Sequence, residues 1–250
     1  MLDVHVPHAT HTWKDFFIHI ATICVGLLIA ISLEQAVEAI HRHLERQELR
    51  EALQKETEQI RYDTTDVETT ASSDIAWLKQ EDEILDIAVT NKHALGKFPE
   101  YPVTGFEIPD DPVYKAAKSG NKLGLLTQQE VQAYGEMDGL IILNLRGFDV
   151  MQDDAKEFYL VQSEISFRQI GQTAPQGISR SRRGWAAFTG MTLPLADLRQ
   201  MRSTSERMEL SYEIFRSESR LMRGAAVVML KGERDLRKIQ AAENQFDNLP

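Results

Sequence analysis

The pattern of hydrophobic and polar positions changes sharply near the start of this chain. Phe16–Leu33 reads FFIHIATICVGLLIAISL, eighteen residues without Asp, Glu, Lys or Arg. A helix needs about 20 mostly apolar residues to cross a hydrocarbon core of ~30 Å. Apolar positions continue on one side as far as Ile40. The pattern therefore predicts a transmembrane anchor over 16–40, preceded by a polar tail over 1–15.

The residues before the run suit a lipid–water boundary, where an aromatic ring and a snorkelling ammonium are favourable. The anchor residues are Trp13, Lys14, Phe16, Phe17, Gly26, Leu27, Leu28 and Leu33. Two alternatives stay open. A cleaved signal peptide could end at the weak small-residue site of Ala30 and Ser32, and a helix of this kind could also lie buried in a soluble protein.

A helical stalk is predicted over 41–95, because neither Gly nor Pro occurs between Gly26 and Gly96. Apolar residues recur at spacings of three and four from Leu49 to Val89, which places one face against a partner helix. The stripe skips Glu56, Thr64 and Asp82. The Thr- and Ser-rich stretch 63–74 predicts a bend, because hydroxyls offer the backbone competing hydrogen bonds.

A Pro- and Gly-rich loop is predicted over 96–126, with a short helix from Asp111-Pro112 to Lys118. Thr127 and Glu130 then form a capping box. It opens a helical domain over 127–250, with arms over 127–170 and 193–244. Three glycines at 135, 139 and 147 predict a kink in the first arm.

The last arm keeps a seven-residue apolar register from Leu198 to Leu236, which skips Ser205, Ser219 and Glu233. We expect this arm to pack on the stalk through a seam formed by Leu78, Leu85, Leu198, Met208, Tyr212 and Phe215. The predicted fold is all-α. One N-terminal transmembrane helix continues into the stalk and packs with the long C-terminal helices as an antiparallel hairpin or bundle.

Several of these segments carry a resemblance. There are three such segments: Gly26-Leu-Leu-Ile-Ala30 with Glu34 and Glu38 at the membrane exit, His11–Ile23, and DDPVYKAAKSGNKLGLLTQQEV over Asp110–Val131. Together they resemble an uncharacterised family of bacterial single-pass membrane proteins. That family has an N-terminal anchor followed by a helical domain of unknown function. The resemblance covers about a third of the chain and implies no catalytic residues.

Composition narrows the possible partners. A net charge of −10 argues against nucleic acid. The single cysteine, Cys24, lies inside the predicted span, so no intramolecular disulfide can form. The expected partners are the lipid bilayer and either a second copy of this chain or other membrane-protein subunits.

The sequence gives only weak indications of a metal-binding or catalytic site. His5, His8 and His11 recur every three residues and could bind Zn²⁺ or Cu²⁺, but Pro7 prevents one helix from aligning them. Glu38-x-x-His41 has a di-iron spacing without the second motif that such sites need. Arg180, Arg182 and Arg183 could meet anionic lipid or an acidic partner. The sequence predicts no catalytic residues and no cofactor, and therefore no enzyme.

The expected function is a membrane-anchored scaffold or accessory subunit of a bacterial inner-membrane complex. The alternative is a membrane-anchored sensor or ligand-binding module, with a pocket near Phe98–Phe106. We expect the helical domain on the periplasmic side. Arg42, Arg46 and Arg50 after the span favour the opposite side, since basic residues gather in the cytoplasm.

Overall fold

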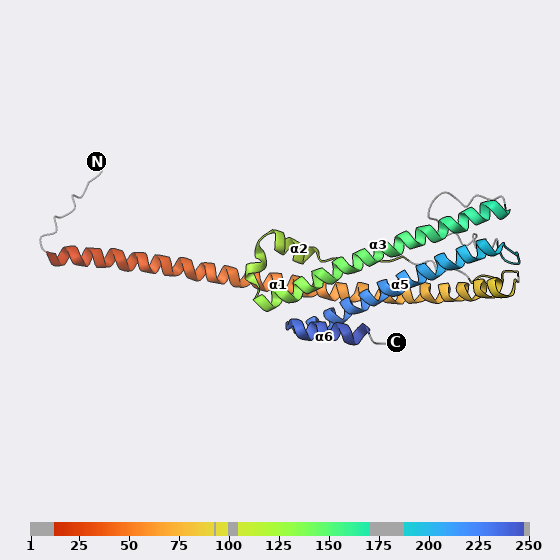
Figure 1. Ribbon diagram of the computed structural model, residues 1–250. Coiled ribbons are helices and arrows are strands. Elements are labelled where there is room, and N and C mark those ends of the chain that lie inside the picture. The colour runs from red at the N-terminus through yellow and green to blue at the C-terminus, as the bar shows by residue number, and fades with distance from the viewer. Residues whose placement is uncertain (1–12, 93, 100–104, 171–187, 248–250) are drawn as a thin grey trace, which may run out of the picture. The chain divides into compact units, whose positions relative to one another are not determined.

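The chain is all-helical, as the sequence predicts. The computed structural model describes residues 13–92, 94–99, 105–170 and 188–247, and these ranges contain no strand (Figure 1). The helices are α1 (Trp13–Asn91), α2 (Pro112–Ser119), the 3₁₀ helix η1 (Lys122–Leu125), α3 (Gln128–Ile170), α5 (Leu195–Leu230) and α6 (Leu236–Asp247). The chain divides into two compact units, 1–51 and 52–250.

Helix α1 runs without interruption through the stretch where we expected a bend. The hydroxyls of Thr57, Thr64 and Ser72 donate to the carbonyls four residues earlier, at 2.7–2.8 Å. These bonds are added to the main-chain ladder and do not replace it. The Thr- and Ser-rich composition therefore satisfies its own hydroxyls inside a continuous helix.

Polar contacts fix the direction in which α1 and α5 pack. Glu68 pairs with Arg220 at 2.9 Å, Lys79 with Glu213 at 3.2 Å, and Asp86 with Arg202. The residue numbers rise on α1 while they fall on α5, so the two helices are antiparallel. This confirms the predicted packing of the stalk against the C-terminal arm.

Helix α3 is the third long member of the bundle and also packs antiparallel to α5. Asn144 donates to Ser219 at 2.9 Å, and Gln169 donates to Asp197 at 2.9 Å. The expected kink does not interrupt α3, which is helical throughout. Instead, Gly147 gives space to a neighbour, because a Cβ there would clash with the Glu218 carboxylate.

The predicted second arm, 193–244, is two helices and not one. The turn after α5 contains Gly232 with φ +89°, a left-handed conformation that favours glycine. The Glu233 carboxylate then accepts from the main-chain N–H of Asp235 at 2.9 Å, which helps to start α6. As a result Leu236 is only half-buried, whereas Ile239 is fully buried.

The short elements are attached to the bundle through helix caps. The Glu56 carboxylate on α1 accepts from the N–H groups of Val113 and Tyr114, which lie in the first turn of α2. The predicted capping box is present at α3. Thr127 N–H donates to Glu130 Oε2 at 2.8 Å, and Glu130 N–H donates to the Thr127 hydroxyl at 3.3 Å.

Candidate functional site

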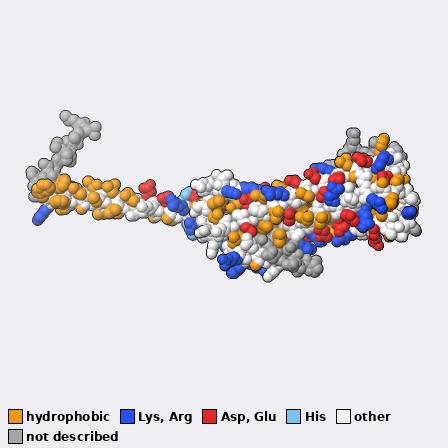
Figure 2. All heavy atoms as spheres, in the orientation of Figure 1, with side chains coloured by type: hydrophobic (Ala, Val, Ile, Leu, Met, Phe, Trp, Pro, Cys, Tyr) orange, Lys and Arg blue, Asp and Glu red, His pale blue; other side chains and the backbone are white. Residues whose placement is uncertain are grey.

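The N-terminal part of α1 presents apolar side chains to its surroundings on every side. All residues of 13–44 are exposed, with Phe17, Leu28 and Leu33 at 62%, 63% and 66% (Figure 2). Among the described residues, α1 is the one helix long and apolar enough to cross a membrane. None of this apolar window is buried within the protein, which does not fit the alternative of an interior helix. The signal-peptide alternative remains compatible with these observations.

Polar and aromatic groups within the anchor are arranged to suit lipid. The Thr22 hydroxyl donates to the carbonyl of Ile18 at 2.9 Å, and the Ser32 hydroxyl donates to Leu28 at 2.7 Å. These bonds matter because an unsatisfied polar group in hydrocarbon costs several kcal/mol (about 2–7). At the N-terminal end, the Trp13, Phe16 and Phe17 rings form a cluster with centroids 5.8–6.3 Å apart.

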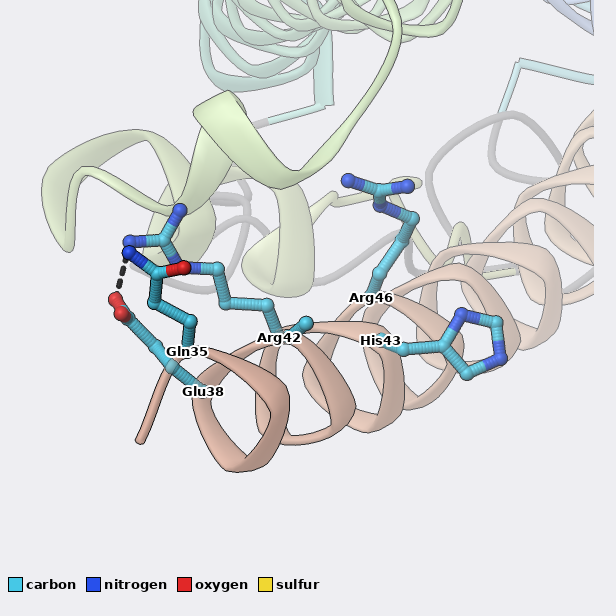
Figure 3. Close-up of a pocket in the computed structure, with 6 residues that line it drawn as sticks. Gln35, Glu38, Arg42, His43 and Arg46 are labelled. Carbon is cyan, nitrogen blue, oxygen red and sulfur yellow. Dashed lines mark hydrogen bonds and ion pairs between the residues drawn. The ribbon is translucent and has the colours of Figure 1, made fainter. Parts of the chain in front are cut away.

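Charged side chains follow the anchor directly on the same helix. A shallow hollow on α1 is lined by Gln35, Glu38, Ala39, Arg42, His43 and Arg46 (Figure 3). Glu38 and Arg42 point toward one another and form an ion pair, whereas His43 points away from them. Both partners of the pair are exposed, so the interaction adds little stability. This cluster places charge next to the apolar run and forms no enclosed binding site.

The candidate metal ligands receive no support from this arrangement. Among the described residues, no three or more His, Cys, Asp or Glu side chains are grouped so that they could hold a metal ion. His41 lies 3.5 Å from Glu45 rather than in a ligand set with Glu38. His5, His8 and His11, and also Arg180, Arg182 and Arg183, lie outside the described residues.

The predicted seam residues lie in one hydrophobic core. Leu78, Leu85, Leu198, Met208, Tyr212 and Phe215 are all 0–3% exposed and belong to the same cluster. The methionines of the α5 register, Met201, Met208, Met222 and Met229, are buried as well. These methionines are core residues and do not form an open groove.

Aromatic rings fill the region where we expected a sensor pocket. The Phe106 ring lies 5.4 Å from the Phe215 ring and 6.3 Å from the Phe148 ring, centroid to centroid. Phe98 is 6% exposed and belongs to the core. Residues 100–104 of the proposed pocket wall lie outside the described residues. The described part of this region is therefore packed core.

A partly buried ion network crosses the α1–α5 interface, and the sequence pattern did not reveal it. Glu68 on α1 pairs with Arg220 at 2.9 Å and with Arg223 at 2.6 Å. Their side chains are 13–22% exposed. Arg220 and Arg223 are three residues apart on α5, so both can reach one carboxylate. The three-residue spacing of these two arginines was the sequence feature that could have indicated the ion network.

A second missed feature is a pair of acidic residues on α1. Glu81 is fully buried, and burial raises its pKa well above the ordinary value, with the negative charge of Asp82 adding to the effect. Burial, together with nearby Glu209 and Glu206, raises the pKa of Asp82 to about 6, although Ser205 opposes the shift. Thus two positions that the apolar stripes skipped, Asp82 and Ser205, lie beside each other.

No protein-family model, curated protein or solved structure matches this chain. The resemblance to a family of bacterial single-pass membrane proteins therefore stays a prediction. The features that bear on function are the exposed apolar part of α1, the charged segment that follows it and the packing of the helical unit.

Proposed function

We propose that this chain is a non-enzymatic, single-pass protein of the bacterial inner membrane. Its helical domain acts by interaction, as a scaffold or as an accessory subunit of a membrane complex. The observation that carries the proposal is the exposed apolar surface of α1. Phe17, Leu28 and Leu33 are each more than 60% exposed on a helix that is long enough to cross a bilayer. Burial in lipid would remove that surface from water, at about 25 cal/mol per Å².

The helical unit supports a role in binding other proteins. Large apolar side chains remain exposed on the outer faces of α3 and α5, including Val150 at 56%, Leu160 at 63%, Leu210 at 60% and Ile214 at 47%. On the face shown in Figure 2, acidic and basic side chains lie interspersed over the helical unit. Apolar anchors within a charged surface are typical of protein–protein contacts. A second copy or another membrane subunit is the partner class we favour.

Membrane integration is tested by fractionation. Wild-type protein should stay in the membrane pellet after washes with high salt and with alkaline carbonate. A variant without Met1–Leu33 should move to the soluble fraction. Release of the wild-type protein by carbonate would show that it lies on the membrane surface or is soluble, and would refute the anchor.

Sidedness and partnership need separate measurements. We place the helical domain in the periplasm, so a C-terminal reporter that is active only there should give signal, and a cytoplasmic reporter should not. The scaffold role predicts that gentle detergent extraction keeps the chain in a complex larger than one protomer plus its micelle. A monodisperse monomer would contradict the scaffold role and leave the anchor unaffected.

A further inference from the structure

Glu81 is an exceptional buried side chain in this protein. Its exposed fraction is 0%, and neither carboxylate oxygen has a hydrogen-bond partner among the described residues. A carboxylate at this position loses its hydration without gaining a hydrogen bond that would replace it. The neutral, protonated acid is much easier to accommodate there, although its hydroxyl still lacks an acceptor.

The chain segment after α1 returns along the face of α1 that carries Glu81. Ala94–Pro99, which we call the strap, returns along α1. The Pro99 carbonyl accepts from Trp77 Nε1 at 3.1 Å, and Gly96 lies so close to Ile84 that a Cβ there would be 3.7 Å from Ile84 Cγ2. Positions 77, 81 and 84 are separated by four and three residues, so they share one face of the helix. Glu81 therefore lies between the two positions of α1 that the strap contacts.

The strap is attached to the bundle at separate points. Leu95 N–H donates to the Met191 carbonyl at 2.8 Å, and Gly190 N–H donates to the Leu95 carbonyl at 2.7 Å. The hydrogen bond from Trp77 Nε1 to Pro99 and the buried side chains of Leu95 and Phe98, which are 2% and 6% exposed, are further attachments. A segment with short, separate attachments can open without unfolding the long helices.

The charges around Glu81 favour the neutral acid. On α1, Asp82 is the neighbouring charge that acts on Glu81, and Asp74 is buried on the same face. On α5, Glu206 and Glu209 face Asp82. On the strap, Lys97 is exposed. In the described part of the chain no basic side chain pairs with Glu81, so ionisation there would add an uncompensated negative charge.

We infer that Glu81 and the strap form a proton-operated latch, which stays closed over the neutral carboxyl and opens when the carboxyl releases its proton to water. Opening would hydrate the carboxylate and uncover the face of α1 that carries Trp77. This inference rests on the helical unit alone and does not depend on the anchor or on the proposed scaffold role.

The direction of the pH effect follows from the burial of Glu81. The pKa of Glu81 with the strap closed is raised above the ordinary value of 4.5, mainly by burial. The closed state therefore binds a proton that the open state releases, and it is most stable below pH 4.5. Closure weakens as the pH rises above 4.5, where each further pH unit lowers the closed-to-open ratio by about tenfold. The fall ends once the pH passes the raised pKa, because the carboxyl is then ionised in both states.

Hydrogen exchange on the full-length protein in detergent micelles tests the latch between pH 5 and pH 9. After correction for the intrinsic exchange rate, protection of the peptide that contains Leu95 should fall at least tenfold with rising pH. Peptides from the middle of α3 should keep constant protection. Constant protection of the wild-type strap over this range would refute the latch.

Three variants assign the effect to one carboxyl. Glu81→Gln should keep the strap protected at every pH, whereas the matched control Glu83→Gln, at an exposed position two residues away, should respond like wild type. Asp82→Asn should keep the response and shift its midpoint to lower pH, because one neighbouring charge is removed. A wild-type response in Glu81→Gln would overturn the inference, as would loss of the response in Asp82→Asn alone. Circular dichroism at 222 nm should show equal helicity for all of them.

Discussion

The two halves of α1 share one continuous backbone, but they differ in what surrounds their apolar side chains. In the first half, Leu28 and Leu33 are 63% and 66% exposed; in the second, Leu78 and Leu85 are 0% exposed. Residues 16–33 of the first half are apolar around the whole circumference, so no single neighbouring helix could cover them. The second half has an apolar stripe that is buried in the bundle, as Leu78 and Leu85 show. Helix formation and burial are therefore separate properties of the sequence.

The polar groups of the two halves differ in the same way. In the anchor, hydroxyls are satisfied within the helix, as with Thr22 and Ser32. In the helical unit, charged groups reach across to another helix, as Glu68 does to Arg220 and Arg223. A lipid-facing helix must satisfy its own polar groups, because hydrocarbon offers no partners. A bundle helix can share them, and each of the following predictions tests one side of this contrast.

The largest effect is expected from charge placed in the anchor. Leu27→Arg combined with Leu28→Arg should raise the free energy of membrane insertion by about 6 kcal/mol, at about 3 kcal/mol for each arginine near the centre of a span. Carbonate-resistant protein in the membrane pellet should fall sharply. The thermal midpoint of the helical unit should not change, because both leucines lie in the anchor and neither is buried against the rest of the protein.

Charge of the same sign and amount outside the span is the matched control. Gln47→Arg with Gln54→Arg adds the same two positive charges on the same helix, at positions that are already exposed. This variant should stay in the membrane pellet. If both double variants stayed in the membrane pellet to the same extent, the apolar run would not be the anchor. The proposed difference between the two halves of α1 would then be wrong.

The next largest effect is expected in the core of the bundle. Phe215→Asp places a carboxylate at a position that is 0% exposed, and should lower the free energy of unfolding by about 4 kcal/mol. Leu210→Asp on the same helix is the control, since Leu210 is 60% exposed, and should change stability by less than about 0.5 kcal/mol. Chemical denaturation followed by circular dichroism measures both. Equal stability of the two variants would mean that the α5 register is misassigned.

The smallest effects concern ion pairs. Glu68→Ala leaves two partly buried arginines unpaired and should cost about 2 kcal/mol, below the range measured for fully buried pairs. Glu157→Ala removes a bidentate pair with Arg207 whose side chains are 45–48% exposed, and should cost about 0.5 kcal/mol. The same denaturation experiment compares them. A larger loss for Glu157→Ala than for Glu68→Ala would show that burial does not rank the ion pairs of this bundle.

Some features could be predicted from the sequence because their causes are local. The apolar run from Phe16 to Leu33 defines a helix whose surface suits lipid, whatever the rest of the chain does. The capping box of Thr127 and Glu130 lies within four residues and is present as expected. The all-α fold and the antiparallel packing of the stalk on the C-terminal arm likewise follow from long apolar stripes that need a partner.

Other features depend on residues far apart in the chain, and only the tertiary structure decided them. The register that brings Glu68 to Arg220, or Gly147 to Glu218, results from the fit of whole helix faces. The sequence placed Asp82 and Ser205 at skipped positions, but it could not show that they lie beside each other. The sequence pattern did not single out Glu81, which the folded bundle buries completely. Local pattern determines which elements form, whereas packing determines which polar groups lose their water.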